Sequence, residues 1–125
     1  MSEPTEYYIP QYTREQDLVN DIIDWFVWHG AWAERINSGT QVIEDHAGKR
    51  RVFRGAKKGT SDILACWPGG LFIAVEAKLR GKKPKPEQNA FLARIREIGG
   101  LAIVAYSPQD VEREIKTFID KLREA

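Results

Sequence analysis

The sequence predicts a single α/β domain. Three segments carry apolar residues at helical spacing, and short runs typical of strands lie between them. The length of 125 residues allows one domain with one core, and 42% hydrophobic and 30% charged residues are ordinary values for a globular chain. We expect residues 1–12 to form an N-terminal extension and residues 13–125 to form the domain.

The first helix is expected between Thr13 and Gly30. Thr13 can cap it, Gln16 completes a capping box three residues later, and Gly30 ends it. The apolar stripe that predicts burial consists of Leu18, Val19, Ile22, Ile23 and Phe26.

Strand-like runs follow the first helix. The candidates in chain order are residues 31–36, which lead into the turn composition Asn37-Ser38-Gly39, then the weaker run 50–54, and then the strong runs 61–67 and 71–78. Because Pro68-Gly69-Gly70 joins the last two runs, they are expected to form a β-hairpin.

The remainder of the chain predicts helix, strand and helix. Pro86 suits a first helical position, and Gly99-Gly100 ends that helix. Residues 101–106 form a short apolar run typical of a buried strand, and Ser107-Pro108 begins the last helix. The predicted order is therefore helix, three or four strands, helix, strand, helix.

Charge is distributed unevenly along the chain. The formal net charge is +1, but residues 1–48 carry −7, residues 49–85 carry +9 and residues 86–125 carry −1. A segment as basic as residues 49–85 attracts a polyanion such as nucleic acid, although a solvated lysine-rich surface is the alternative.

Several classes of protein are not expected. No apolar run approaches the roughly 20 residues of a membrane span, and the N-terminus does not resemble a secretory signal. The single cysteine, Cys66, excludes a disulfide framework and is expected to fill the core. His29 and His46 lack zinc-ligand partners at a suitable spacing. We expect a reducing cytoplasm.

Three charged residues converge at one end of the predicted hairpin. In residues 71–78, Glu76 and Lys78 share a face, and antiparallel pairing brings Asp62 to the same end. Carboxylates are the hard ligands that Mg²⁺ or Mn²⁺ requires, and a nearby lysine suits phosphodiester hydrolysis. A surface salt bridge between Glu76 and Lys78 is the alternative, and spacing alone does not decide between them.

Glu15 and Gln88 lie on the core-facing stripes of their helices. An inward carboxylate or amide needs a partner, which a polar metal site would supply. Alternatively, both are ordinary polar residues of a first helical turn.

These residues, in this order, resemble the VRR-NUC branch of the PD-(D/E)xK nuclease superfamily, which includes stand-alone viral and bacterial nucleases and DNA-repair nucleases. The resemblance covers about residues 13–108. It rests on Glu15, Arg35-Ile36-Asn37-Ser38-Gly39, Gly55-Ala56-Lys57-Lys58-Gly59-Thr60-Ser61-Asp62, Glu76-Ala77-Lys78, Glu87-Gln88 and Gly99-Gly100-Leu101-Ala102-Ile103-Val104.

The resemblance implies a restriction-endonuclease-like α-β-β-β-α-β core, here followed by a C-terminal helix. It implies that Asp62, Glu76 and the backbone carbonyl of Ala77 bind the catalytic Mg²⁺ or Mn²⁺, and that Lys78 orients or activates the attacking water. Glu15 would contact the metal or its water, and Gln88 would support the site. Ser61 stands where the family pattern usually has proline, which leaves the ligands intact.

The implied activity is a metal-dependent DNA endonuclease. We expect a homodimer that cuts branched DNA such as a Holliday junction, because stand-alone members of this family resemble junction-cleaving dimers. A flap or linear-duplex nuclease and a non-catalytic nucleic-acid-binding module on the same fold are the alternatives. A bacterial or phage-infected host fits this type of chain. The residues expected to hold DNA phosphates are Arg35, Arg50, Arg51, Arg54, Lys57, Lys58, Arg80, Lys82, Lys83 and Lys85.

Overall fold

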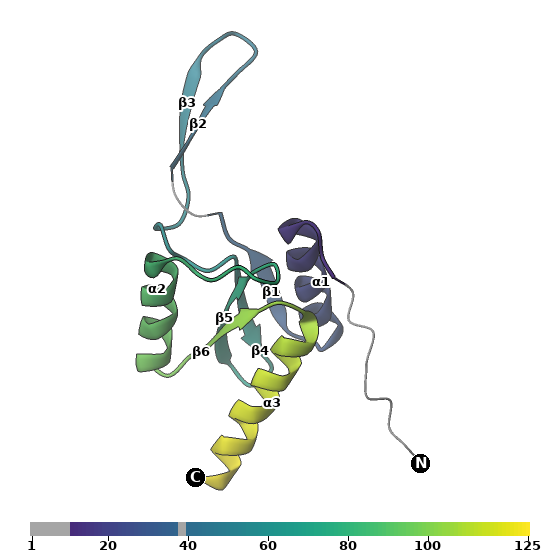
Figure 1. Cartoon of the computed structure of the whole chain (residues 1–125). Coiled ribbons are helices and arrows are strands. Elements are labelled where there is room, and N and C mark those ends of the chain that lie inside the picture. The colour runs from purple at the N-terminus through teal and green to yellow at the C-terminus, as the bar shows by residue number, and fades with distance from the viewer. Residues whose placement is uncertain (1–10, 38–39) are drawn as a thin grey trace.

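A four-stranded sheet with helices on both faces forms the body of the protein (Figure 1). The computed structural model describes residues 11–37 and 40–125, without the side chains of residues 40, 41, 53 and 54. The sheet has the order β1-β4-β5-β6, in which β1 is Trp32–Arg35, β4 is Ile63–Trp67, β5 is Leu71–Ala77 and β6 is Leu101–Ala105. The helices are α1 (Glu15–Trp28), α2 (Pro86–Glu97) and α3 (Pro108–Glu124).

Alternation along the central strand β5 separates two cores. Ile73, Val75 and Ala77 pack on the face covered by α1 and α3, whereas Ala74 packs with α2 residues Leu92 and Ile95 on the other. Both faces of β5 are therefore buried, which explains why its sequence is an almost continuous apolar run. Within that run, Glu76 is the exception.

The strand connections follow the predicted order. β4 and β5 pair as an antiparallel hairpin from Ile63↔Val75 to Trp67↔Leu71. β5 and β6 then pair in parallel, with α2 as the crossover. The predicted hairpin and the predicted buried strand over residues 101–106 are both confirmed.

A second, two-stranded sheet rises from the body, as Figure 1 shows. It consists of β2 (Thr40–Glu44) and β3 (Arg50–Arg54), and we call it the β2–β3 ribbon. The sequence predicts β3 only weakly and does not predict β2. The physical reason is that Val42, Ile43 and Val52 are exposed, so neither strand needs the apolar alternation that marks burial on a core.

Two predictions from local sequence are wrong. Arg14, in extended backbone and without a side-chain capping bond, precedes α1, so Thr13 and Gln16 form no capping box. Cys66 is exposed rather than buried, because it lies on the outward side of the β4–β1 pair, opposite the exposed Trp32. The residues on either side of Cys66 face the large core. The sequence of β4 is therefore apolar, and its composition predicted that Cys66 is buried as well.

The C-terminal helix begins as predicted. The Ser107 hydroxyl accepts a hydrogen bond from the Asp110 backbone N–H at 3.3 Å, and Pro108 occupies the first turn. Val111 and Ile115 are buried against the sheet, whereas the end of the helix is exposed. Within residues 11–37 and 40–125, no helix has the length and apolar character to cross a membrane.

Gly59 holds the loop before β4 against α2. Its φ is +94°, and a Cβ there would lie 2.6 Å from the Glu87 carbonyl oxygen. Gly69 in the β4–β5 turn has a similar φ of +99° but open space around it. We predict that Gly59→Ala destabilises the fold by about 2–4 kcal/mol, from backbone strain plus overpacking, and Gly69→Ala by about 1–2 kcal/mol from strain alone. Urea unfolding of both variants measures the difference, and equal losses would contradict the close approach.

Candidate metal and nucleic-acid site

Asp62 and Glu76 meet at one end of the sheet. Asp62 immediately precedes β4, and the β4–β5 register places it beside the end of β5. The Asp62 Oδ2 atom accepts a hydrogen bond of 3.0 Å from the Ala77 backbone N–H, which orients its carboxylate. Glu76, the preceding residue on β5, is 1% exposed. The hairpin therefore brings the two carboxylates together, as its predicted geometry requires.

Lys78 completes this group. Its Nζ lies 3.5 Å from Glu76 Oε1, and the lysine is only 8% exposed. Its backbone N–H donates to the Ala105 carbonyl at 3.0 Å, so the residue is anchored to β6 just beyond the end of β5. The Glu76–Lys78 pair is therefore buried, unlike the exposed surface salt bridge that was the alternative. The free energy lost by removing both charges from water exceeds what their attraction returns to the stability of the fold.

The environment of Glu76 disfavours its ionised form. Burial, followed by the neighbouring Asp62 carboxylate, raises the pKa of the Glu76 carboxyl from its ordinary 4.5 to about 8, although Lys78 acts in the opposite direction. A buried carboxyl group that is protonated at neutral pH contributes little to the stability of the fold. An additional cation between the two carboxylates would reverse this effect.

The site fits a hard divalent cation. Both oxygens of Glu76 are buried and have no hydrogen-bond partner within the part of the chain that is described. Orphaned buried oxygens beside a second carboxylate are the donor set that Mg²⁺ or Mn²⁺ requires. Asp62, Glu76 and the Ala77 carbonyl are the groups available to hold it.

Glu15 does not join this pair as a third carboxylate. It is the first residue of α1 and is half-buried. In residues 11–37 and 40–125, no three His, Cys, Asp or Glu side chains cluster closely enough to hold a metal ion. A contact of Glu15 with the metal, direct or through water, stays a prediction.

Gln88 has a local structural partner. Its Oε1 accepts a hydrogen bond of 2.8 Å from the Lys85 backbone N–H and so caps the start of α2. This is the first-turn role that was the alternative for a polar residue here. A contribution of the remaining amide group to the site stays a prediction.

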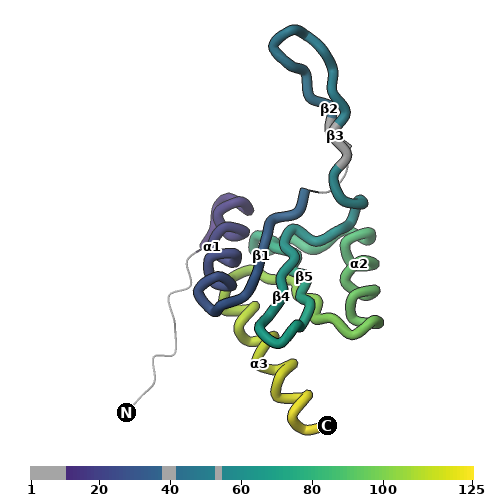
Figure 2. Tube along the Cα trace, turned by 180° about the vertical axis from the view of Figure 1, so that it is seen from behind, coloured from purple at the N-terminus to yellow at the C-terminus, as the bar shows by residue number. Residues whose placement is uncertain are grey.

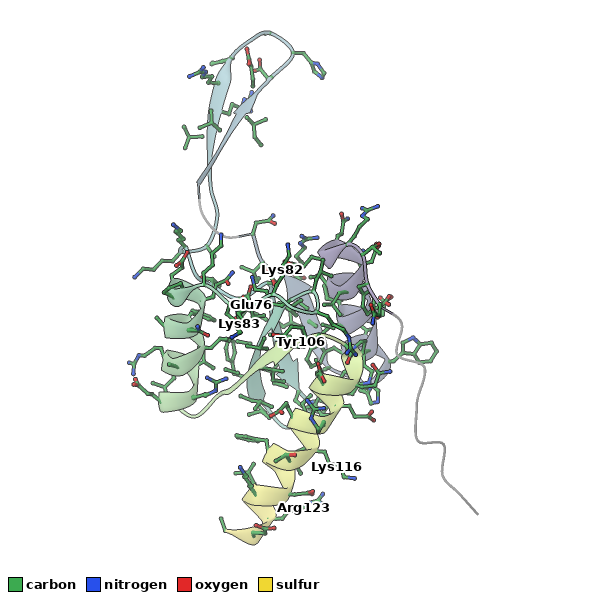
Figure 3. The ribbon with its side chains drawn as sticks, in the orientation of Figure 1. Glu76, Lys82, Lys83, Tyr106, Lys116 and Arg123 are labelled. Atoms are coloured by element: carbon green, nitrogen blue, oxygen red, sulfur yellow. The ribbon has the colours of Figure 1, made fainter. Side chains whose placement is uncertain are left out.

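Basic residues follow Lys78 in the loop that leads to α2. Arg80, Lys82, Lys83 and Lys85 are all exposed. Figure 3 labels Lys82 and Lys83 at the same end of the sheet as Glu76, whereas Lys116 lies along α3. Cations at this end of the sheet can attract the phosphates of a nucleic acid toward the carboxylate pair.

Tyr106 positions this loop, a role that sequence reasoning missed. Its hydroxyl donates a hydrogen bond of 2.9 Å to the Lys82 carbonyl. Its backbone N–H donates to Asp110 Oδ2 at 2.8 Å, which ties it to α3. The only signal in the sequence is a tyrosine at the end of a buried strand, and its meaning depends on the parallel pairing of β5 with β6.

The other predicted DNA contacts lie before β4. Arg35 ends β1 opposite Ile63, and Lys57 and Lys58 lie in the loop before Asp62, where Lys58 Nζ is 3.8 Å from Glu87 Oε1. Arg50 and Arg51 lie on the ribbon, and Arg51 Nε is 3.9 Å from Asp45 Oδ2. The side chain of Arg54 and residues 1–10, 38 and 39 fall outside the described part. The structure thus places these cations in two groups, on the body and on the ribbon.

The pKa of Glu76 predicts a pH-dependent stability of the metal-free protein. Because the folded-state pKa is raised, this group contributes stability below pH 4.5 that is lost as the pH rises through about 8. In EDTA, we expect the Glu76→Gln variant to melt about 5 °C or more above the wild type at pH 9 and to lose this advantage toward pH 4.5. Melting curves between pH 4.5 and pH 9 test this.

Asp17→Asn, at an exposed carboxylate on α1, is the matched control and should follow the wild type at every pH. Added Mn²⁺ should raise the melting temperature of the wild type at high pH more than that of Glu76→Gln. Parallel pH curves for the wild type and Glu76→Gln would contradict the burial argument.

Comparison with known proteins agrees with this geometry. The VRR-NUC domain model matches residues 13–109. A solved structure described as a VRR_NUC domain superposes with a TM-score of 0.58 at 23% identity, and the match covers 82% of this chain and 94% of that one. No curated protein matches. The family match spans most of the chain, and the superposition shows the shared fold. The chain therefore belongs to the VRR-NUC domain family, and its function is of the nuclease type, with DNA as the substrate.

Proposed function

We propose that this protein is a Mg²⁺- or Mn²⁺-dependent endodeoxyribonuclease that cuts four-way (Holliday) junctions as a homodimer in DNA repair. Its place would be the cytoplasm of a bacterium or of a phage-infected cell. The observation that carries the proposal is the buried Glu76 carboxylate beside Asp62 and Lys78, since neither of its oxygens has a hydrogen-bond partner among the described residues.

Each residue of the site has a chemical task. Asp62, oriented by the Ala77 N–H, and Glu76 would hold the cation together with the Ala77 carbonyl. The chemistry that such an ion would supply when bound is polarisation of the phosphate and a lowered pKa of water. Lys78 directs its ammonium group toward the carboxylate pair, where it orients the attacking water or stabilises the charge that develops on the phosphate.

The basic groups on the body hold the DNA. Exposed Lys and Arg side chains on the loops before Asp62 and after Lys78 contact phosphates without reading sequence. Tyr106, as the anchor of the second loop, keeps its cations near Glu76. The choice of a junction rests on the resemblance to stand-alone junction-cleaving enzymes.

Exposed large apolar side chains at the end of α1 and the start of β1 support the dimer. At the α1–β1 junction, Val27 is 59%, Trp28 is 87% and Trp32 is 53% exposed. Large apolar side chains exposed to water favour association with a partner surface. Trp25 and Trp67, in contrast, stack on one another at 5.6 Å and are half-buried against the core.

Removal of the site carboxylates should abolish cleavage. We expect Asp62→Ala and Glu76→Ala each to lower Mn²⁺-dependent cleavage of a labelled four-way junction by more than about 1,000-fold, because the ion supplies several kcal/mol to the transition state. Lys78→Met should lower kcat by about 100-fold or more with a smaller effect on binding.

Matched controls are Asp17→Ala and Lys116→Met, which alter exposed charges on α1 and α3 and should cut as the wild type does. Equal cutting of a linear duplex would remove the junction preference and leave the nuclease. Binding without cleavage under either ion would favour the non-catalytic module instead.

A charge at the α1–β1 junction should separate the dimer. We expect Trp28→Glu to yield a folded monomer that nicks junctions singly and loses paired cuts, since an exposed side chain contributes little to the fold of one chain. Ile98→Glu, at a 64% exposed residue after α2, is the control and should remain dimeric. Light scattering after size exclusion measures both, and a monomeric wild type would refute the dimer.

A further inference from the structure

The β2–β3 ribbon is an independent structural element. Among the described residues, the only extensive contacts of β2 and β3 are with each other. Figures 1 and 2 show the ribbon projecting from the body in both views. A two-stranded hairpin alone is marginally stable in water, so a ribbon that projects in this way is suited to be completed by a partner.

The ribbon exposes apolar side chains that no core covers. Val42 and Val52 lie directly opposite each other and are 63% and 61% exposed. Ile43, opposite Arg51, is 45% exposed on the other face. Cross-strand apolar pairs of this kind stabilise a ribbon slightly but leave most of their surface for a partner.

The charge of the ribbon identifies the class of partner. Residues 40–54 carry four Lys or Arg against two Asp or Glu. Asp45 is occupied in the turn, where its Oδ1 accepts hydrogen bonds of 2.9 Å from the Ala47 and Lys49 backbone N–H groups. Glu44 lies opposite Arg50, and Arg51 Nε is 3.9 Å from Asp45 Oδ2. Cations still exceed carboxylates by two over residues 40–54, and both arginines are exposed, so the ribbon is complementary to a polyanion.

The root of the ribbon adjoins the metal-site carboxylates. The Ile36 backbone N–H donates to the Asp62 carbonyl at 2.8 Å, and the Ala56 N–H donates to the Asn37 carbonyl at 2.8 Å. These bonds close the base of the ribbon at the residue that, in the proposed function, binds the metal. DNA held with a phosphate at Asp62 consequently lies beside the ribbon.

We propose that the β2–β3 ribbon enters a groove of the DNA duplex next to the cut, with Arg50 and Arg51 on the phosphates and the Val42–Val52 pair against the groove wall. This inference rests on the proposed function and adds a second contact region. The DNA major groove admits a two-stranded ribbon. Five-residue strands span about 17 Å, which corresponds to about five base pairs.

A shortened ribbon tests the proposal directly. Residues 42–52 are replaced by Asn-Gly, which closes a two-residue turn between the paired positions 41 and 53. In hydroxyl-radical footprints of a four-way junction in EDTA, we expect the wild type to protect about five base pairs more than this variant beside each of the two cut sites, on one side of each site only. An unchanged footprint would overturn the proposal. Loss of the dimer in the variant would also overturn it and would make a second copy of this chain the partner.

Paired substitutions test the apolar contact. Val42→Thr together with Val52→Thr keeps the β-branched shape and strand propensity, and should weaken junction binding by about tenfold. Ile98→Thr with Leu122→Thr is matched in exposure, at 64% and 61%, and should bind as the wild type does. Equal binding by both double variants would refute the contact.

Binding and cleavage are read separately in these experiments. The footprints and affinities in EDTA report on the ribbon, whereas cleavage in Mn²⁺ reports on the carboxylate site. A wild type that shows the ribbon-dependent footprint without any cleavage supports this inference and refutes the proposed nuclease chemistry.

Discussion

The burial of the Glu76 carboxylate is the constraint on which the rest of the structure depends. A carboxylate at 1% exposure, next to Asp62, raises the free energy of the folded chain through desolvation and repulsion. Lys78 offsets part of this at 3.5 Å. The rest must come from the hydrophobic packing of the sheet, so the protein accepts an unfavourable residue at its site and stabilises it elsewhere.

The two-layer packing of β5 provides that stabilisation. Ile73 and Val75 pack beneath α1 and α3, while Ala74 packs beneath α2. A one-residue slip of β5 would exchange these faces and move Glu76 into the larger core. Neighbours on both sides, β4 antiparallel and β6 parallel, prevent such a slip. The same register brings Asp62 to Ala77 and Lys78 to Ala105, so the packing of the core determines the geometry of the site.

The body and the ribbon follow different physical principles. The body buries its apolar residues and presents a rigid pair of carboxylates at one end of the sheet, with Tyr106 anchoring the loop that carries Lys82. The ribbon leaves Val42 and Val52 in water and extends from the residue next to Asp62. A rigid catalytic site combined with an extended, cationic ribbon suits an enzyme whose substrate is much larger than itself.

By itself, the sequence determined the elements whose signals are local or periodic. The stripe from Leu18 to Phe26, the turn Pro68-Gly69-Gly70 and the Ser107-Pro108 helix start all predicted what is observed, because helical spacing, turn chemistry and capping act within a few residues. The ordered acidic and basic residues also indicated the VRR-NUC family. Tertiary structure decided what depends on distant neighbours. Pairing of β4 with β5 and of β5 with β6 made Glu76 and Lys78 a buried pair, and capping of α2 occupied the Gln88 oxygen. The exposure of Cys66 depended on β1, and β2 formed without any apolar alternation because it packs on no core. The residues next to a given residue in the sequence do not determine these partners. The burial and the charge environment of a side chain arise only when separate strands and helices pack together.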